Sequence, residues 1–149
     1  MSKTLQGKFR PQNPDKYKGD AGNILYRSSW ELEFMKWCDR REQIIWWQSE
    51  EKAIWYYCPI MKKNRRYFPD FILARQTEHG IMEEVIEIKP QKQIDGPKTN
   101  PKRKTKYWLN EVYTYANNTA KWKAAMEWAE DRGMNFRLLS EQSIKEWQR

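Results

Sequence analysis

Two short runs of apolar and charged residues, Arg66–Phe71 and Val85–Lys89, place the strongest constraint on how this chain folds. The first run contains a Pro-Asp pair and the second ends in Glu-Ile-Lys. Because side chains alternate between the two faces of a strand, Glu87 and Lys89 point the same way, while the isoleucines beside them point the other way. If the two runs pair as strands, Asp70, Glu87 and Lys89 meet at one end of a small sheet.

Two carboxylates and an ammonium group in one cleft are costly unless something holds them together. A hard divalent cation can do so, because Mg²⁺ is bound by a few carboxylates, waters and substrate phosphate oxygens. Such a site favours metal-assisted hydrolysis of a phosphodiester. An acid followed by Glu-x-Lys is a common pattern, and its context adds weight: Asp70 follows a proline, Glu87 lies on the next strand, and an upstream helix begins with a further acid, Glu31.

The first expected helix runs from about Ser29 to Asp39, with Trp30, Phe34, Trp37 and Cys38 on one face. Ser28 and Glu31 form a capping-box pattern at its start. Glu31 therefore has two interpretations of equal weight. It caps its own helix, or it is a third carboxylate delivered to the cleft.

The charge of the chain favours a polyanionic partner. The formal net charge is +8 and the isoelectric point is about 9.4, which favours nucleic acid over a merely solvated basic surface. A basic loop, residues 90–106, follows directly after Lys89. We expect its cations to hold backbone phosphates, although such a run is also typical of a solvated face.

The scarcity of cysteine and histidine, and the absence of long apolar runs, argue against several classes of protein. Two widely spaced cysteines give neither a disulfide framework nor a zinc site, so we expect buried free thiols. A single histidine, His79, argues against histidine-based catalysis and is expected in a turn. The chain shows no signal-peptide pattern and no apolar run approaching about 18 residues, which predicts a soluble, intracellular protein without a membrane partner.

The order of elements predicts an α/β (α+β) fold. We expect a basic arm without regular elements over residues 1–23 and a single domain over 24–149. Within the domain we expect strands at 43–48, 53–58, 65–75 and 81–89, the last three as an antiparallel meander. A helical pattern over 104–130 is expected to break at residues 117–119, followed by a strand at 136–139 and a last helix from Ser140. This is a mixed sheet flanked by helices.

The acid pattern resembles the PD-(D/E)xK nuclease superfamily, which implies a restriction-endonuclease-like core. The Arg27–Glu31 box resembles the Arg-Ser-x-x-Glu segment of phage resolvases and of TnsA-type transposon endonucleases, and residues 121–141 also resemble TnsA. Further segments resemble the head completion nucleases of T-even-like tailed phages: Gly7–Phe9, Asn13-Pro14, Lys16-Tyr17, Gly19-Asp20, Tyr26–Ser28, Trp30-Glu31, Phe34-Met35, Cys38–Arg40 and, most specifically, Arg65–Phe71.

This resemblance implies a metal-binding catalytic site, a set of DNA contacts and a role in phage assembly. Asp70 and Glu87 would bind Mg²⁺ or Mn²⁺, completed by the Ile88 carbonyl and by Glu31 as a third ligand. Lys89 would position the water or stabilise the phosphate. The expected DNA contacts are Arg27, Gln91, Lys92, Lys98, Lys102, Arg103 and Lys104. The implied partners are double-stranded DNA and phage head, portal or neck proteins, met in the host cytoplasm during assembly or in the virion.

Alternative functions remain open at this point. One is a non-catalytic protein that binds DNA and the portal with a decayed nuclease fold, since fold does not fix function. The intact acid set weighs against decay. Another is a resolvase of branched DNA, which would need a dimer. The resemblance implies a nuclease that acts on duplex DNA as an endonuclease and also as an exonuclease, and we favour this interpretation.

Overall fold

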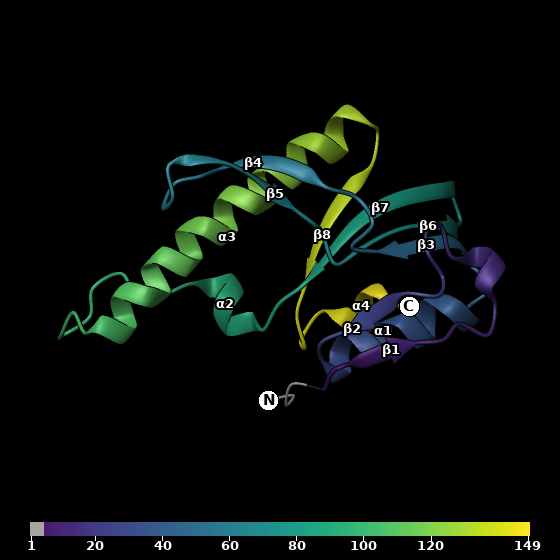
Figure 1. The fold of residues 1–149 in the computed structure, drawn as a ribbon, viewed down its shortest axis with the longest axis horizontal. Coiled ribbons are helices and arrows are strands. Elements are labelled where there is room, and N and C mark those ends of the chain that lie inside the picture. Colours follow the sequence, from purple (N-terminus) through teal and green to yellow (C-terminus); the bar gives the residue numbers. More distant parts are fainter. Residues whose placement is uncertain (1–4) are drawn as a thin grey trace.

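The computed structural model describes residues 5–149. Its centre is a sheet in the order β3-β6-β7-β8, formed by Ile44–Ser49, Phe71–Thr77, Gly80–Ile88 and Asn135–Leu139 (Figure 1). The first three strands are antiparallel, whereas β8 runs parallel to β7. The predicted α/β (α+β) class, with a mixed sheet flanked by helices, is therefore confirmed.

Helices cover both faces of this sheet. Helix α1, Ser29–Arg40, and the short α4, Ile144–Trp147, pack on the face that includes Phe71 and Ile86. Helix α3, Lys106–Asp131, covers the opposite face through Ala129. The alternation of side chains along β6 and β7 produces these two cores, because each strand is buried on both sides.

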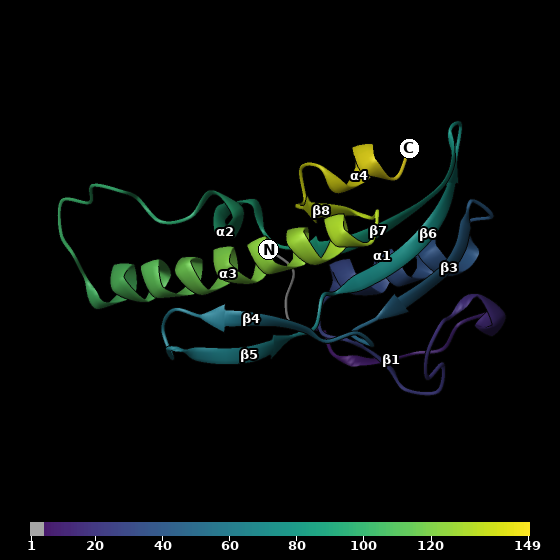
Figure 2. The same ribbon diagram turned by 90° about the horizontal axis from the view of Figure 1, so that it is seen from above.

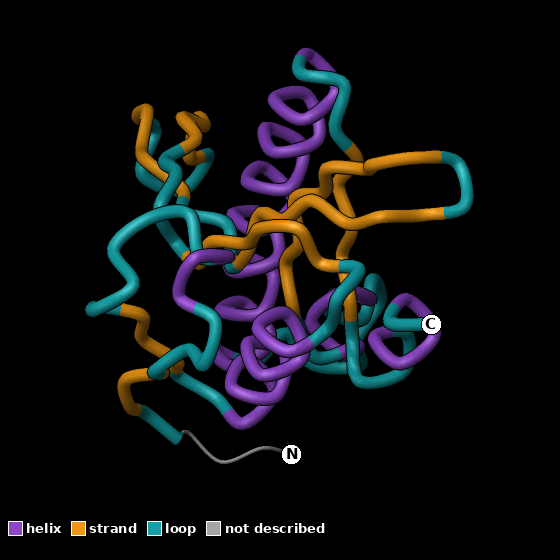
Figure 3. The backbone as a smooth tube through the Cα atoms, turned by 90° about the vertical axis from the view of Figure 1, so that its right-hand side faces the viewer, coloured by secondary structure: helices purple, strands orange, loops and turns teal. Residues whose placement is uncertain are grey.

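The predicted meander is wrong in its pairing. Strand β4, Ile54–Cys58, pairs with β5, Lys63–Tyr67, in a separate hairpin, and β6 pairs with β3 instead. The expected strand over 65–75 is broken at Pro69, which has no backbone N–H to continue a ladder. The hairpin packs across α3 and stands apart from the β6–β7 turn, which projects on the other side of the molecule (Figure 3).

Helix α3 is continuous, so the expected break at 117–119 is wrong. Its polar residues are bonded without interrupting the backbone: Asn117 Oδ1 accepts from Tyr56 Oη at 2.9 Å, and Thr119 Oγ1 donates to the Ala116 carbonyl at 3.0 Å. The side chain of Thr105 caps the helix by accepting from the Trp108 amide at 3.0 Å. Its first turns, the short α2, Gln91–Asp95, and the loop between them extend beyond the sheet (Figure 2).

The N-terminal segment is folded against the domain where the structure describes it, from residue 5 onward. Strand β1, Gly7–Phe9, pairs with β2, Ile24–Tyr26, and a 3₁₀ turn, Pro14–Lys16, lies between them. The expectation of no regular element here is therefore wrong for the described residues. The first four residues of the expected arm lie outside them. Within residues 5–149, no helix is both long and apolar enough to cross a membrane.

Asp39 explains why this segment is ordered. It is fully buried at the end of α1, where its carboxylate accepts from the Gln12 amide at 2.8 Å and from the Asn13 amide at 3.0 Å. These bonds satisfy two backbone donors that lie outside any helix or strand. A buried acid at the end of a helix thus fixes a segment 26 residues earlier in the chain.

Replacing Asp39 with Ala is expected to lower the free energy of unfolding by about 2–4 kcal/mol, because one hydrogen bond to a charged group contributes about 1.5–3 kcal/mol and two bonds to the same carboxylate are not fully additive. Residues 10–16 should also become sensitive to limited proteolysis. Urea unfolding and protease digestion measure the two effects. Asp15→Ala, at an exposed position of the same segment, is the matched control. Equal stability of the two variants would contradict this role of Asp39.

Candidate active site

Asp70 and Glu87 meet at one end of the sheet, as the sequence predicts. The register pairs Phe71 with Ile86, so Asp70 lies opposite Glu87 immediately before β6 begins. Directly opposed residues share a face, and here it is the face covered by α3. Lys89 Nζ lies 3.7 Å from Glu87 Oε2. Two carboxylates and a lysine from neighbouring strands are thus brought together.

Each carboxylate accepts hydrogen bonds through one of its two oxygens. Asp70 Oδ2 accepts from the Ile88 amide at 2.9 Å. Glu87 Oε1 accepts from the Tyr67 hydroxyl at 2.6 Å and from the Asp70 amide at 3.2 Å. The backbone of Ile88 is therefore bonded directly to the acid pair. Among the described residues, Asp70 Oδ1 accepts no hydrogen bond and Glu87 Oε2 has only the Lys89 ammonium, 3.7 Å away, so both oxygens can serve as ligands of a cation.

The electrostatics of the pair favour a positive ligand. Burial and the charge of Glu87 raise the pKa of Asp70 well above its ordinary value. Burial also raises the pKa of Glu87, against the opposing effects of Lys89 and of the Tyr67 hydrogen bond. Buried like charges disfavour the ionised state. A divalent cation between them would remove this cost and would match the oxygen ligands that Mg²⁺ and Mn²⁺ prefer.

Glu31 lies in the first turn of α1, which Ser28 caps. Its amide donates to Ser28 Oγ at 3.1 Å, and Ser28 Oγ lies 3.1 Å from Glu31 Oε2. Burial raises the pKa of Glu31, and its charge in turn raises the pKa of Asp70. Among residues 5–149, no group of three or more acidic, histidine or cysteine side chains is close enough to hold a metal. Ser28 is thus the cap of α1, the Glu31 carboxylate accepts from the Ser28 hydroxyl, and the charge of Glu31 is felt at Asp70.

The expected DNA contacts fall into two groups. Near the sheet, Arg27 forms an ion pair with Glu50 at 2.6 Å, which ties the start of α1 to the end of β3. Gln91 is held by the Ser140 hydroxyl at 2.7 Å, and Lys92 lies 5.9 Å from the Tyr107 ring centre. The other cations lie in the loop between α2 and α3, at the far end of α3 (Figures 1 and 2): Lys98, Lys102, Arg103 and Lys104.

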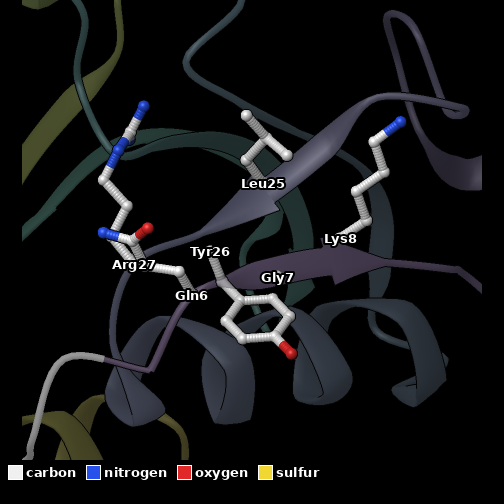
Figure 4. Close-up of a pocket in the computed structure, with 6 residues that line it drawn as sticks. All are labelled: Gln6, Gly7, Lys8, Leu25, Tyr26 and Arg27. Atoms are coloured by element: carbon white, nitrogen blue, oxygen red, sulfur yellow. The ribbon is translucent and has the colours of Figure 1, made fainter.

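The acid pair does not line either of two surface concavities. One, of about 300 Å³, lies over the β1–β2 ribbon, where Lys8, Leu25 and Arg27 rise from the same side and the Tyr26 ring lies on the other (Figure 4). The other, of about 270 Å³, lies beside Asn23 and Glu50. The acid pair therefore lies outside these two hollows, with Glu87 buried at the end of β7.

Two residues of the site were missed by sequence reasoning. Tyr67 is buried, and burial together with the charge of Glu87 raises its pKa, so the hydroxyl stays protonated and donates to the carboxylate. Lys121 of α3 lies with Nζ 5.7 Å from the centre of the Tyr67 ring. In β5, Tyr67 is buried whereas the four residues before it are exposed, so strand periodicity gave no signal for it. For Lys121, the available signal was its place on the same helix face as Asn117 and Ala125.

The mixed sheet with an acid pair and lysine at one strand end defines the restriction-endonuclease-like class. The model of the TnsA-like endonuclease N-terminal family matches residues 41–141, and the chain belongs to that family. It is also similar to the head completion nuclease of Enterobacteria phage T4, with 43% identity over 143 residues, which is 93% of each chain. No solved structure gives a significant match.

Proposed function

We propose that this chain is a metal-dependent DNA nuclease that acts in phage head completion, before head and tail join. The observation that carries the proposal is the convergence of Asp70, Glu87 and Lys89 at one end of the sheet. The TnsA-like endonuclease family and the name of the phage T4 relative support it. Endonucleolytic cleavage is the primary activity proposed, with exonucleolytic cleavage as a second.

The chemistry follows from the groups around the acid pair. Mg²⁺ or Mn²⁺, bound by Asp70 Oδ1 and Glu87 Oε2, would polarise the phosphate and lower the pKa of a bound water. In this proposal the Ile88 carbonyl completes the ligand set, and Glu31 joins it, directly or through water, by turning away from Ser28. Lys89 orients the water or stabilises negative charge on the phosphate. Tyr67 holds Glu87 in place.

The partners proposed are double-stranded DNA and proteins of the phage head, portal or neck. A net charge of +8 supports the first, because Lys and Arg that neutralise phosphates release counterions. The phage T4 relative supports the second. The setting proposed is the host cytoplasm during assembly, or the virion. Arg27, Gln91 and Lys92 are proposed to contact phosphate beside the site, with the distal loop cations farther along the duplex.

Metal removal tests the nuclease directly. The purified protein is incubated with linear and with covalently closed circular duplex DNA, in Mg²⁺, in Mn²⁺ and in EDTA. We expect cleavage with either metal and none in EDTA, because the acid pair alone supplies no Lewis acid. Cleavage of circles would establish endonuclease activity, and shortening of linear DNA alone would indicate an exonuclease. Binding without cleavage in any metal would instead favour the non-catalytic head-binding role.

A further inference from the structure

The surface beside the acid pair is cationic. Lys121, on the side of α3 that faces the hairpin, lies with Nζ 5.7 Å from the Tyr67 ring centre and 5.9 Å from that of Tyr56. Such ring faces attract an ammonium group and fix its position. Within residues 5–149, no carboxylate lies at ion-pair distance from Lys121. The Tyr67 ring that Lys121 faces donates its hydroxyl hydrogen bond to Glu87.

The β4–β5 hairpin continues this cationic surface away from the acid pair. Its register places Arg65 opposite Tyr56 and Lys63 opposite Cys58, so both cations belong to the hairpin face that packs toward α3. Residues 54–67 contain four lysines and arginines and no acid. Arg65 and Lys63 are exposed. A row of cations therefore runs outward from the Glu87 carboxylate along the junction of hairpin and helix.

The hairpin is held firmly enough to serve as a binding surface. Asn117 Oδ1 accepts from the Tyr56 hydroxyl at 2.9 Å and from Cys58 Sγ at 3.2 Å. Ile54 and Tyr67 pack with Ala125 in a buried cluster between the hairpin and α3. A rigid surface loses little conformational freedom on binding. Burial lowers the pKa of Lys121, and the charges of Lys89 and Arg65 lower it further against the opposing charge of Glu87, so these cations lie close enough to repel one another.

We propose that the junction of the β4–β5 hairpin with α3, comprising Lys63, Arg65 and Lys121, binds the phosphodiester backbone of the DNA strand beside the acid pair. Lys121 contacts the phosphate nearest to Asp70 and Glu87, and Arg65 and Lys63 contact phosphates farther out. This inference rests on the proposed function for its substrate. A polyanion is the occupant that the charge selects, because residues 54–67 carry four lysines and arginines and no acid.

The test measures DNA binding in EDTA, where no cleavage is expected. Fluorescence anisotropy with a labelled duplex is recorded at several salt concentrations for Lys121→Ala, Arg65→Ala and the control Lys123→Ala. Lys123 is an exposed lysine on the same helix, two residues away. We expect Lys121→Ala and Arg65→Ala each to weaken binding by about 5–10-fold and to reduce the salt slope by about one, as loss of one phosphate contact predicts.

The outcomes separate this inference from the nuclease itself. If Lys121→Ala and Arg65→Ala bind like Lys123→Ala, with an unchanged salt slope, the interface is wrong even when metal-dependent cleavage is observed. If both variants lose affinity for DNA but the protein cleaves DNA in neither metal, the proposed DNA-binding junction is supported and the proposed nuclease activity is contradicted. Melting temperatures check that the variants are folded. Because Arg65 is exposed on β5, its variant tests the surface even if Lys121→Ala unfolds.

Discussion

Replacing Asp70 with Asn, or Glu87 with Gln, is expected to reduce cleavage of duplex DNA by at least about 1,000-fold. A bound metal contributes several kcal/mol of transition-state stabilisation, and about 4 kcal/mol corresponds to this factor. Affinity for DNA in EDTA should remain within about twofold, because neither carboxylate attracts phosphate. Glu83→Gln is the matched control, since Glu83 is exposed on the same strand. Wild-type cleavage rates in either site variant would exclude the proposed site.

Thermal stability distinguishes loss of metal binding from damage to the fold. Burial raises the pKa values of Asp70 and Glu87, and the charge of Glu87 raises that of Asp70 further, so the folded protein holds their protons more tightly than the unfolded chain does. Stability of the metal-free protein therefore falls as pH rises past the ordinary carboxyl range. At neutral pH, Asp70→Asn should melt at the same or a higher temperature. Mg²⁺ should raise the melting temperature of the wild type only.

Removing the carboxylate of Glu84 is expected to cause the largest loss of stability, about 3–5 kcal/mol in Glu84→Ala. Glu84 is fully buried in β7, with Arg75 Nε at 2.7 Å and Arg137 Nε at 3.2 Å from its oxygens. Trp147 Nε1 lies 3.5 Å away, so one carboxylate joins β6, β7, β8 and α4. Its loss leaves the two guanidinium groups facing each other without their acid.

Urea unfolding measures this effect, with Glu83→Ala as the control on the adjacent, exposed position. A second variant, Glu84→Ala combined with Arg137→Met, removes one of the two cations as well and should recover part of the loss. A change below about 1 kcal/mol in the single variant would show that the buried ion pairs do not support the sheet.

The parts of the site that were predictable depend on local periodicity. The alternation of Val85–Lys89 placed Glu87 and Lys89 on one face, and the Ser28 cap was readable from residues three apart. Asp70 was predictable because it precedes the neighbouring strand. Each of these inferences needs only a few consecutive residues and the geometry of a strand or a helix.

The parts that could not be predicted depend on contacts between distant segments. The pairing of β6 with β3 rather than β4 follows from a break at Pro69 and from packing on α3. The order of the N-terminal segment depends on the buried Asp39. The roles of Tyr67 and Lys121 arise only when the hairpin meets α3. Tertiary packing determines the strand pairing, the order of the N-terminal segment and the contacts of Tyr67 and Lys121. A pattern of a few consecutive residues does not predict such packing.

The parallel pairing of β7 with β8 has a consequence for the order of folding. Ile88 pairs with Leu139, and the Lys89 amide donates to the Leu139 carbonyl at 2.9 Å, so the strand that carries Glu87 is flanked by a segment far from it in sequence. Pairings this distant in sequence cost loop-closure entropy before they stabilise the fold. The hairpin from Phe71 to Ile88 alone therefore does not complete the surroundings of the acid pair, which also depend on residues synthesised long after Glu87.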